Sequence, residues 1–79
     1  MTAKELKKLE GLPDRLRTLI FESGETYKEF AGALGVYPAY VCKWVNGGAI
    51  PTARYLCAIC RYYGVTSDWL LGLDDERGW

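Results

Sequence analysis

A glycine between two short amphipathic segments is the feature of this sequence that most limits its fold. The stretch from Thr26 to Asn46 reads TYKEFAGALGVYPAYVCKWVN. Thr26 and Glu29 have the spacing of a capping box, in which a hydroxyl and a carboxylate each satisfy a free amide at a helix N-terminus. Gly35 is the residue type that most easily adopts the left-handed conformation that ends a helix. These signals predict a short helix over 27–34.

A second helix is predicted over 38–45. Pro38 suits the first position of a helix because the amide that it lacks would be unpaired there in any residue. Val41, Trp44 and Val45 then form one apolar face, and the Asn-Gly pair that follows ends the pattern. Because only three residues separate the two helices, they cannot stack antiparallel along their full length. We therefore expect a helix-turn-helix, in which the helices cross steeply.

Three further helices are predicted, over 13–23, 53–63 and 68–71. Each segment has an apolar stripe of helical period and a glycine after it. Thr52 is expected to cap the second of them, and Ser67 precedes the last. The predicted fold class is thus all-α, a compact bundle of five short helices containing a helix-turn-helix. The predicted core consists of Leu16, Leu19, Ile20, Phe30, Ala31, Leu34, Val41, Trp44, Leu56, Ile59 and Leu70.

The chain of 79 residues is predicted to form one small domain over 12–73. Residues 1–11 are an N-terminal extension in which a second Thr-x-x-Glu box predicts a helical turn, and 74–79 form a polar tail. A domain of this size buries only about 60–65% of its unfolded surface, so association with a second copy would add stability. Trp69, Leu70, Leu71 and Leu73 crowd the C-terminal segment, and we expect part of it to join a homodimer contact.

Composition argues against an enzyme. The chain has no histidine, hence no imidazole base, and its glycines do not form a phosphate loop. No paired carboxylates converge in a predictable pocket, and so small a bundle is expected to have little room for a substrate cavity. Neither a cofactor nor a small-molecule ligand is predicted.

A Cys-x-x-Cys pair, Cys57 and Cys60, lies within the predicted helix over 53–63. Without histidine or a second such pair, one chain cannot assemble a four-ligand zinc site from Cys and His. A thioredoxin-like interpretation would need a neighbouring βαβ unit, which the sequence does not predict. The two cysteines are expected to be packing or surface residues of a helix, and no metal site is predicted.

Charge is polarised along the chain although the net charge is zero. Between residues 36 and 63 the charged residues are Lys43, Arg54 and Arg61, whereas 64–79 is acidic on balance. Such a distribution is compatible with binding to a polyanion through few contacts. No apolar run approaches the roughly 20 residues of a membrane span, and the first residues lack the apolar core of a secretion signal. We therefore expect no membrane contact and a cytoplasmic protein.

The ordered motifs between residues 12 and 73 resemble the lambda repressor/Cro (Xre-type) family of helix-turn-helix domains. The resemblance is carried by Thr-x-x-Glu-Phe-Ala, Ala-Leu-Gly-Val, Val-x-x-Trp-x-Asn-Gly, Ile-Pro, Leu-x-x-Ile and Tyr-Gly-Val-x-x-Asp-Trp-Leu-Leu-Gly. It implies a sequence-specific regulator of transcription, a repressor of phage or bacterial type. Such a protein would bind a two-fold double-stranded DNA operator as a homodimer, with the helix over 38–45 in the major groove.

The resemblance places the candidate DNA contacts on the helix-turn-helix, at Tyr27, Lys28, Tyr37, Pro38, Ala39, Tyr40, Lys43 and Asn46. Members of the family usually read bases with Gln, Ser, Arg or Asn. Pro38 and Ala39 offer only apolar contact, for instance to a thymine methyl group, and Lys43 can reach guanine or a phosphate. A tyrosine at position 37, where the family has Ser or Thr, cannot cap the helix as those residues do.

Two questions remain open at the level of sequence. The tyrosines at 27, 37 and 40 fit contacts with DNA as well as they fit partly buried aromatic packing. If they instead docked a partner protein, the helix-turn-helix would be an interaction module without specific DNA binding. Arg15 and Arg17 lie off the apolar stripe of their helix, so they form either a solvated face or a phosphate contact.

Overall fold

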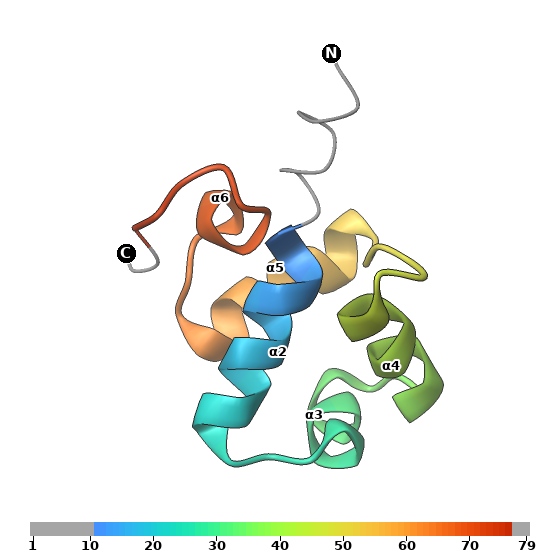
Figure 1. Cartoon of the computed structure of the whole chain (residues 1–79). Helices are drawn as coiled ribbons and strands as arrows, with labels where there is room; N and C mark the ends of the chain where they lie inside the picture. Colours follow the sequence, from blue (N-terminus) through green and yellow to red (C-terminus); the bar gives the residue numbers. More distant parts are fainter. Residues whose placement is uncertain (1–10, 77–79) are drawn as a thin grey trace.

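The computed structural model describes residues 11–76, which form five helices and no β-strand (Figure 1). The predicted all-α class is therefore confirmed. The predicted N-terminal helical turn lies outside the described residues. The helices are α2 (Gly11–Ser23), α3 (Tyr27–Leu34), α4 (Pro38–Asn46), α5 (Ala53–Tyr63) and α6 (Ser67–Leu70).

The ends of α3 follow from local chemistry, as predicted. The Thr26 amide donates to Glu29 Oε1 at 3.0 Å, and the Glu29 amide donates to Thr26 Oγ1 at 3.1 Å. These bonds lower the pKa of the Glu29 carboxyl from its usual value. Gly35 ends the helix with a φ of 74°, a left-handed conformation that side chains with a Cβ rarely adopt. Both predicted bounds of this helix are confirmed.

Other helix ends differ from the prediction by one or two residues. Helix α2 spans Gly11–Ser23, two residues more at its N-terminal end than predicted, and Leu12, only 3% exposed, adds to its buried stripe. Thr52 occupies the N-cap of α5 without a side-chain hydrogen bond, so the expected cap is wrong in this respect. The cap of α6 is Thr66, whose hydroxyl accepts from the Trp69 amide at 3.1 Å. This bond moves the last helix one residue toward the N-terminus.

Helix α2 runs through the middle of the molecule, with α4 on one side and α6 on another (Figure 1). Most predicted core residues are buried, but Leu34 and Leu56 are only partly buried and pack against the core from outside. Cys57 is exposed and Cys60 is buried on α5, as expected of helix surface and packing residues. The buried residues are Leu12, Leu16, Leu19, Ile20, Phe30, Ala31, Val41, Trp44, Val45, Ile59, Cys60, Val65, Trp69 and Leu70.

Arg15 joins α2 to the C-terminal segment. Its guanidinium lies 5.0 Å from the centre of the Trp69 ring and donates to the carbonyl oxygens of Trp69 at 2.7 Å and Asp74 at 2.6 Å. It also pairs with Asp75 at 3.3 Å. Arg15 is therefore neither a solvated surface residue nor a phosphate contact, because its guanidinium binds the C-terminal segment of the same chain. Trp69 is only 7% exposed and packs within its own chain, whereas Leu73 is 58% exposed, so of these two it is Leu73 that a homodimer contact could cover.

Glu25, in the turn between α2 and α3, holds the end of α5. The Tyr62 hydroxyl donates to Glu25 Oε2 at 2.6 Å and the Tyr63 hydroxyl donates to Oε1 at 3.3 Å. The Phe30 ring stacks on Tyr63 with centroids 5.4 Å apart. Burial, with Glu25 adding to it, raises the pKa of Tyr63 to about 12. This cluster fixes the start of the helix-turn-helix against α5.

Tyr63 should make the protein sensitive to alkali. An unfolded tyrosine loses its proton near pH 10, whereas folded Tyr63 keeps it up to a pKa of about 12. The free energy of unfolding therefore includes the full contribution of this pKa difference below about pH 10. That contribution is lost as pH rises toward 12. Tyr63→Phe should flatten the fall of Tm with pH over this range, measured by circular dichroism. The exposed Tyr37→Phe should keep the wild-type profile, and an unaltered profile in Tyr63→Phe would contradict the assignment.

Candidate nucleic-acid interface

Helices α3 and α4 form the predicted helix-turn-helix, joined by the turn from Gly35 to Tyr37. Pro38 occupies the first turn of α4, and Tyr37 is its N-cap without a side-chain hydrogen bond, as expected for a tyrosine. The Tyr37 ring instead lies 6.4 Å from the Tyr40 ring, measured between centroids. The N-terminal end of α4 therefore carries a pair of neighbouring aromatic rings.

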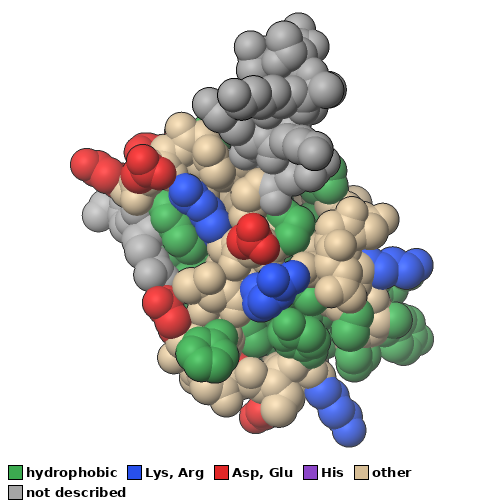
Figure 2. Space-filling model, viewed as in Figure 1, with side chains coloured by type: hydrophobic (Ala, Val, Ile, Leu, Met, Phe, Trp, Pro, Cys, Tyr) green, Lys and Arg blue, Asp and Glu red, His purple; other side chains and the backbone are tan. Residues whose placement is uncertain are grey.

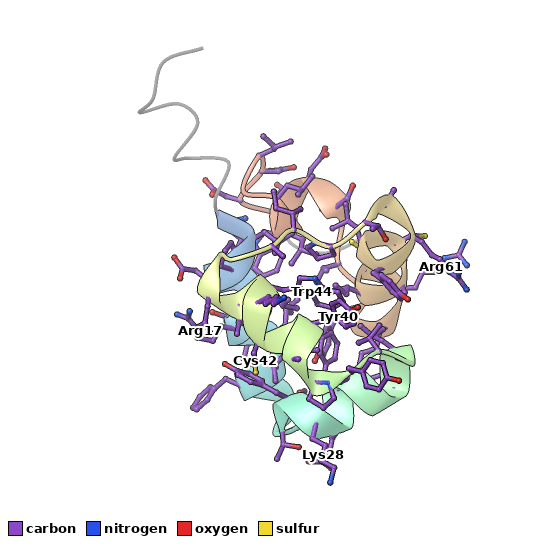
Figure 3. All side chains as sticks on the ribbon, turned by 90° about the vertical axis from the view of Figure 1, so that its right-hand side faces the viewer. Arg17, Lys28, Tyr40, Cys42, Trp44 and Arg61 are labelled. Carbon is purple, nitrogen blue, oxygen red and sulfur yellow. The ribbon has the colours of Figure 1, made fainter. Side chains whose placement is uncertain are left out.

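The inner face of α4 fixes how the helix is rotated. Val41, Trp44 and Val45 are at most 4% exposed. Side chains are spaced about 100° apart around a helix, so Ala39 and Lys43 point away from this buried face, together with Asn46. All three are exposed. Figure 3 looks onto α4, with Cys42 and Tyr40 emerging on its two sides.

The C-terminal end of α4 is held by α2. The Arg17 guanidinium donates to the Val45 carbonyl oxygen at 2.5 Å and lies 3.4 Å from the Asp14 carboxylate. The bond occupies a carbonyl in the last turn of α4, where positive charge is favourable. Gly47 ends the helix with a φ of 78°. The sequence left open whether Arg17 belongs to a solvated face or contacts phosphate. In the structure it is a half-exposed residue that positions α4.

Charge is distributed unevenly over the surface, as the sequence predicted. No acidic residue lies between Glu29 and Asp68, a range that includes the whole of α4. In Figure 3 Arg17 lies to the left of α4 and Lys28 lies below α3. In Figure 2 acidic side chains lie at the upper left, and basic side chains lie beside them, in the centre and at the right edge. The outward face of α4 is thus free of acidic side chains of its own.

Seven of the eight candidate contacts lie on the surface of the helix-turn-helix, which is where the family resemblance requires them. They are Lys28, Tyr37, Pro38, Ala39, Tyr40, Lys43 and Asn46. Tyr27 is different, because it is half-buried and packs against the core. The aromatic surface therefore consists of Tyr37, 76% exposed, and Tyr40, 51% exposed. Arg17 was not among the candidates, since its bond to a carbonyl 28 residues away has no signal in the local sequence.

The expectation of little room for a substrate cavity stays a prediction, because the hollow beside the start of α2 is open to solvent. An open groove of about 750 Å³ lies between the first turn of α2 and the loop after α4, where the lining residues Gly47 and Ala49 fill little space. Its charged lining residues, Asp14 and Arg17, face each other. Within residues 11–76 no three potential metal ligands come together. The helices described in that range are too short or too polar to cross a membrane.

The arrangement of the helices and a match to a family model define the class of this protein. A bundle of short helices with α4 presented on the surface after a glycine turn is the architecture of helix-turn-helix proteins. A family model for helix-turn-helix domains of Cro/C1 type, lambda repressor-like, matches residues 22–70. The chain belongs to this family, whose members are DNA-binding regulators of transcription. Comparison with curated proteins and with solved structures gave no match.

Proposed function

We propose that this protein is a sequence-specific, double-stranded DNA-binding repressor that inserts α4 into the major groove. The observation that carries the proposal is the outward face of α4, which is exposed, free of acidic residues and provided with Lys43. The major groove of B-DNA is about 12 Å wide, so it admits an α-helix. The proposal places the protein in the cytoplasm and assigns it no catalytic role.

The proposal includes a homodimer on a two-fold operator. One copy of α4 presents few polar groups to base edges, so a single domain would bind with low affinity. Two-fold pairing doubles these contacts and fixes the spacing between the two helices. Leu73 is an exposed apolar residue at the C-terminal end that such a contact would cover. Sedimentation with and without an operator duplex would determine the stoichiometry.

Lys43→Ala tests the position of α4. If Lys43 reads guanine, the variant should lose about 1–3 kcal/mol of binding free energy and relax the preference at one base pair. If it contacts phosphate, binding should weaken evenly across sequences, and the slope of log K against log salt should shrink by about 1. The measurement is fluorescence anisotropy with duplexes selected from a random pool, at several salt concentrations.

Cys42→Ser is the matched control for Lys43→Ala. Cys42 is exposed on the same helix, but it lies about 100° away around the axis and carries no charge. We expect this variant to change affinity less than Lys43→Ala does. Equal binding by wild type and Lys43→Ala would contradict the placement of α4 in the groove.

A second candidate function is supported by the exposed aromatic pair. The rings of Tyr37 and Tyr40 lie at one end of α4, and aromatic residues are enriched in protein interfaces. In that case the helix-turn-helix would dock a protein and would not bind DNA specifically. Titration with duplex DNA at low salt separates the two functions. DNA binding whose log K falls with log salt supports the first function. No DNA binding, together with binding to a partner protein that Tyr40→Ala abolishes, supports the second.

A further inference from the structure

Two free thiols, Cys57 and Cys60, lie one turn apart on α5. Cys57 is exposed, and Cys60 is 6% exposed. Both side chains line the same open hollow of about 380 Å³, to which Ser67, the first residue of α6, also contributes. None of the eight candidate DNA contacts lines this hollow. The two thiols therefore form a cluster that the proposed function does not use.

The spacing of the two cysteines suits a bridging ion better than a disulfide bond. Residues three apart on a helix have Cβ atoms about 5–6 Å apart. A disulfide bond requires Cβ atoms about 3.5–4.5 Å apart, so it would distort α5. An ion between the two sulfur atoms spans the wider gap, because each bond from a thiolate to a metal such as zinc is about 2.3 Å long.

The electrostatics of the pair indicate that the two sulfur atoms lie near each other. Burial raises the pKa of the Cys60 thiol from its usual value, and the charge of Cys57 adds to the rise. Two neighbouring thiolates thus repel each other in the absence of a cation. A cation bound between them removes this repulsion, which is why its binding is favourable at this place.

The number of ligands limits which ion fits. Within residues 11–76 no third Cys, His, Asp or Glu completes a set of ligands with the pair. Structural zinc and iron–sulfur clusters take four protein ligands, and calcium and magnesium take oxygen ligands. Monovalent copper is a soft ion that prefers thiolates, and two of them complete its linear coordination. The pair therefore fits monovalent copper.

The other residues that line the hollow suit such a complex. Two thiolates and one monovalent copper ion carry a net charge of −1. Arg61 lines the same hollow four positions after Cys57, a spacing at which side chains on a helix are neighbours. Its positive charge offsets that of the complex. Ala53 and Leu56 give the hollow apolar walls, which favour a soft ion over a strongly hydrated one.

We propose that Cys57 and Cys60 form a binding site for one monovalent copper ion per chain. On binding, each thiol releases its proton to solvent and each sulfur forms one bond to copper. The ion keeps its charge of +1, so no oxidant or reductant takes part. The inference goes beyond the proposed function and does not rest on it, because the site lies on α5 and its ligands are not candidate DNA contacts.

Competition with bicinchoninate, a chelator that is coloured when it holds monovalent copper, tests the proposal. The reduced full-length chain is added to the coloured complex under nitrogen and without DNA. The protein should remove one copper ion per chain, and sedimentation should show that copper leaves the number of chains per particle unchanged. Retention of all copper by the chelator, or one ion shared between two chains, would overturn the proposal.

Cys57→Ser removes one ligand and leaves the core unaltered, because Cys57 is exposed. Its affinity for copper should fall more than about a hundredfold, since loss of a group that merely orients a metal ligand already costs about 10–100-fold. Cys42→Ser is the matched control, because Cys42 is exposed on α4 and lies on the opposite side of Figure 3 from Arg61. This control should bind copper as the wild type does. Equal affinity of Cys57→Ser and wild type would refute the site.

Alkylation with iodoacetamide identifies the ligands in the wild-type chain, without any substitution. In the copper-free protein Cys42 and Cys57 should react rapidly, because both are exposed. One equivalent of monovalent copper should abolish the reaction of Cys57 and leave that of Cys42 unchanged, as peptide mass spectrometry would show. Equal protection of Cys42 and Cys57 would overturn the assignment to α5.

Discussion

Phe30→Ala should destabilise the protein by about 3–5 kcal/mol, a large part of the stability of a small domain. Phe30 has no exposed surface, and its ring lies 5.4 Å from that of Tyr63 and 5.9 Å from that of Tyr62. Its removal leaves a cavity between α3 and α5 and breaks the contact that fixes the start of the helix-turn-helix. Urea denaturation followed by circular dichroism measures the loss.

The chain offers a matched control for this change. Phe21 lies on α2 with 84% of its surface exposed, so Phe21→Ala deletes the same atoms from a side chain that is in water. Its effect should stay within about 0.5 kcal/mol. A similar loss in the two variants would show that burial of Phe30 does not govern stability.

Arg15→Ala is expected to cost about 2–3 kcal/mol, because hydrogen bonds from a charged group and a cation–π contact are lost together. The guanidinium donates to two carbonyl oxygens of the C-terminal segment and lies over the Trp69 ring. The ion pair with Asp75 adds little, since that carboxylate is fully exposed. Unfolding in urea gives the change in free energy, and tryptophan fluorescence reports the exposure of Trp69.

Arg15→Lys separates charge from geometry. Lysine keeps the positive charge, but it lacks the planar fork that donates to several acceptors at once. We expect Arg15→Lys to recover less than half of the loss in Arg15→Ala. Full recovery would show that the contact is one of charge alone, and a loss below about 0.5 kcal/mol in Arg15→Ala would contradict its role in the fold.

Sequence reasoning succeeded where structure depends on neighbouring residues. The bounds of α3 could be predicted because the capping box and Gly35 act within one or two turns. The rotation of α4 could be predicted because Val41, Trp44 and Val45 are all apolar at helical spacing. The same local signals misplaced the cap of α6, since Thr66 and Ser67 are adjacent residues of similar capping ability.

Contacts between distant segments could not be predicted in this way. Arg15 reaches residues 54 to 60 positions away, and a long, flexible side chain gives no sign in its own neighbourhood of where it ends. Tyr27 likewise stands at an exposed position of the helix pattern, yet its ring packs against the core. Of the eight candidate contacts, all but Tyr27 are exposed, and the bond by which Arg17 holds α4 was not predicted.

The short turns between the helices bear on how fast the chain folds. The turns before and after α3 and the turn before α6 each contain three residues, so the contacts of α3 with α4 and of α5 with α6 form across short loops. Folding of domains with such local contacts is fast, in the range of microseconds to milliseconds, because little loop entropy is lost before contacts form. The bonds of Arg15 join residues 54 to 60 positions apart in sequence, so we expect them to form after the helix-turn-helix.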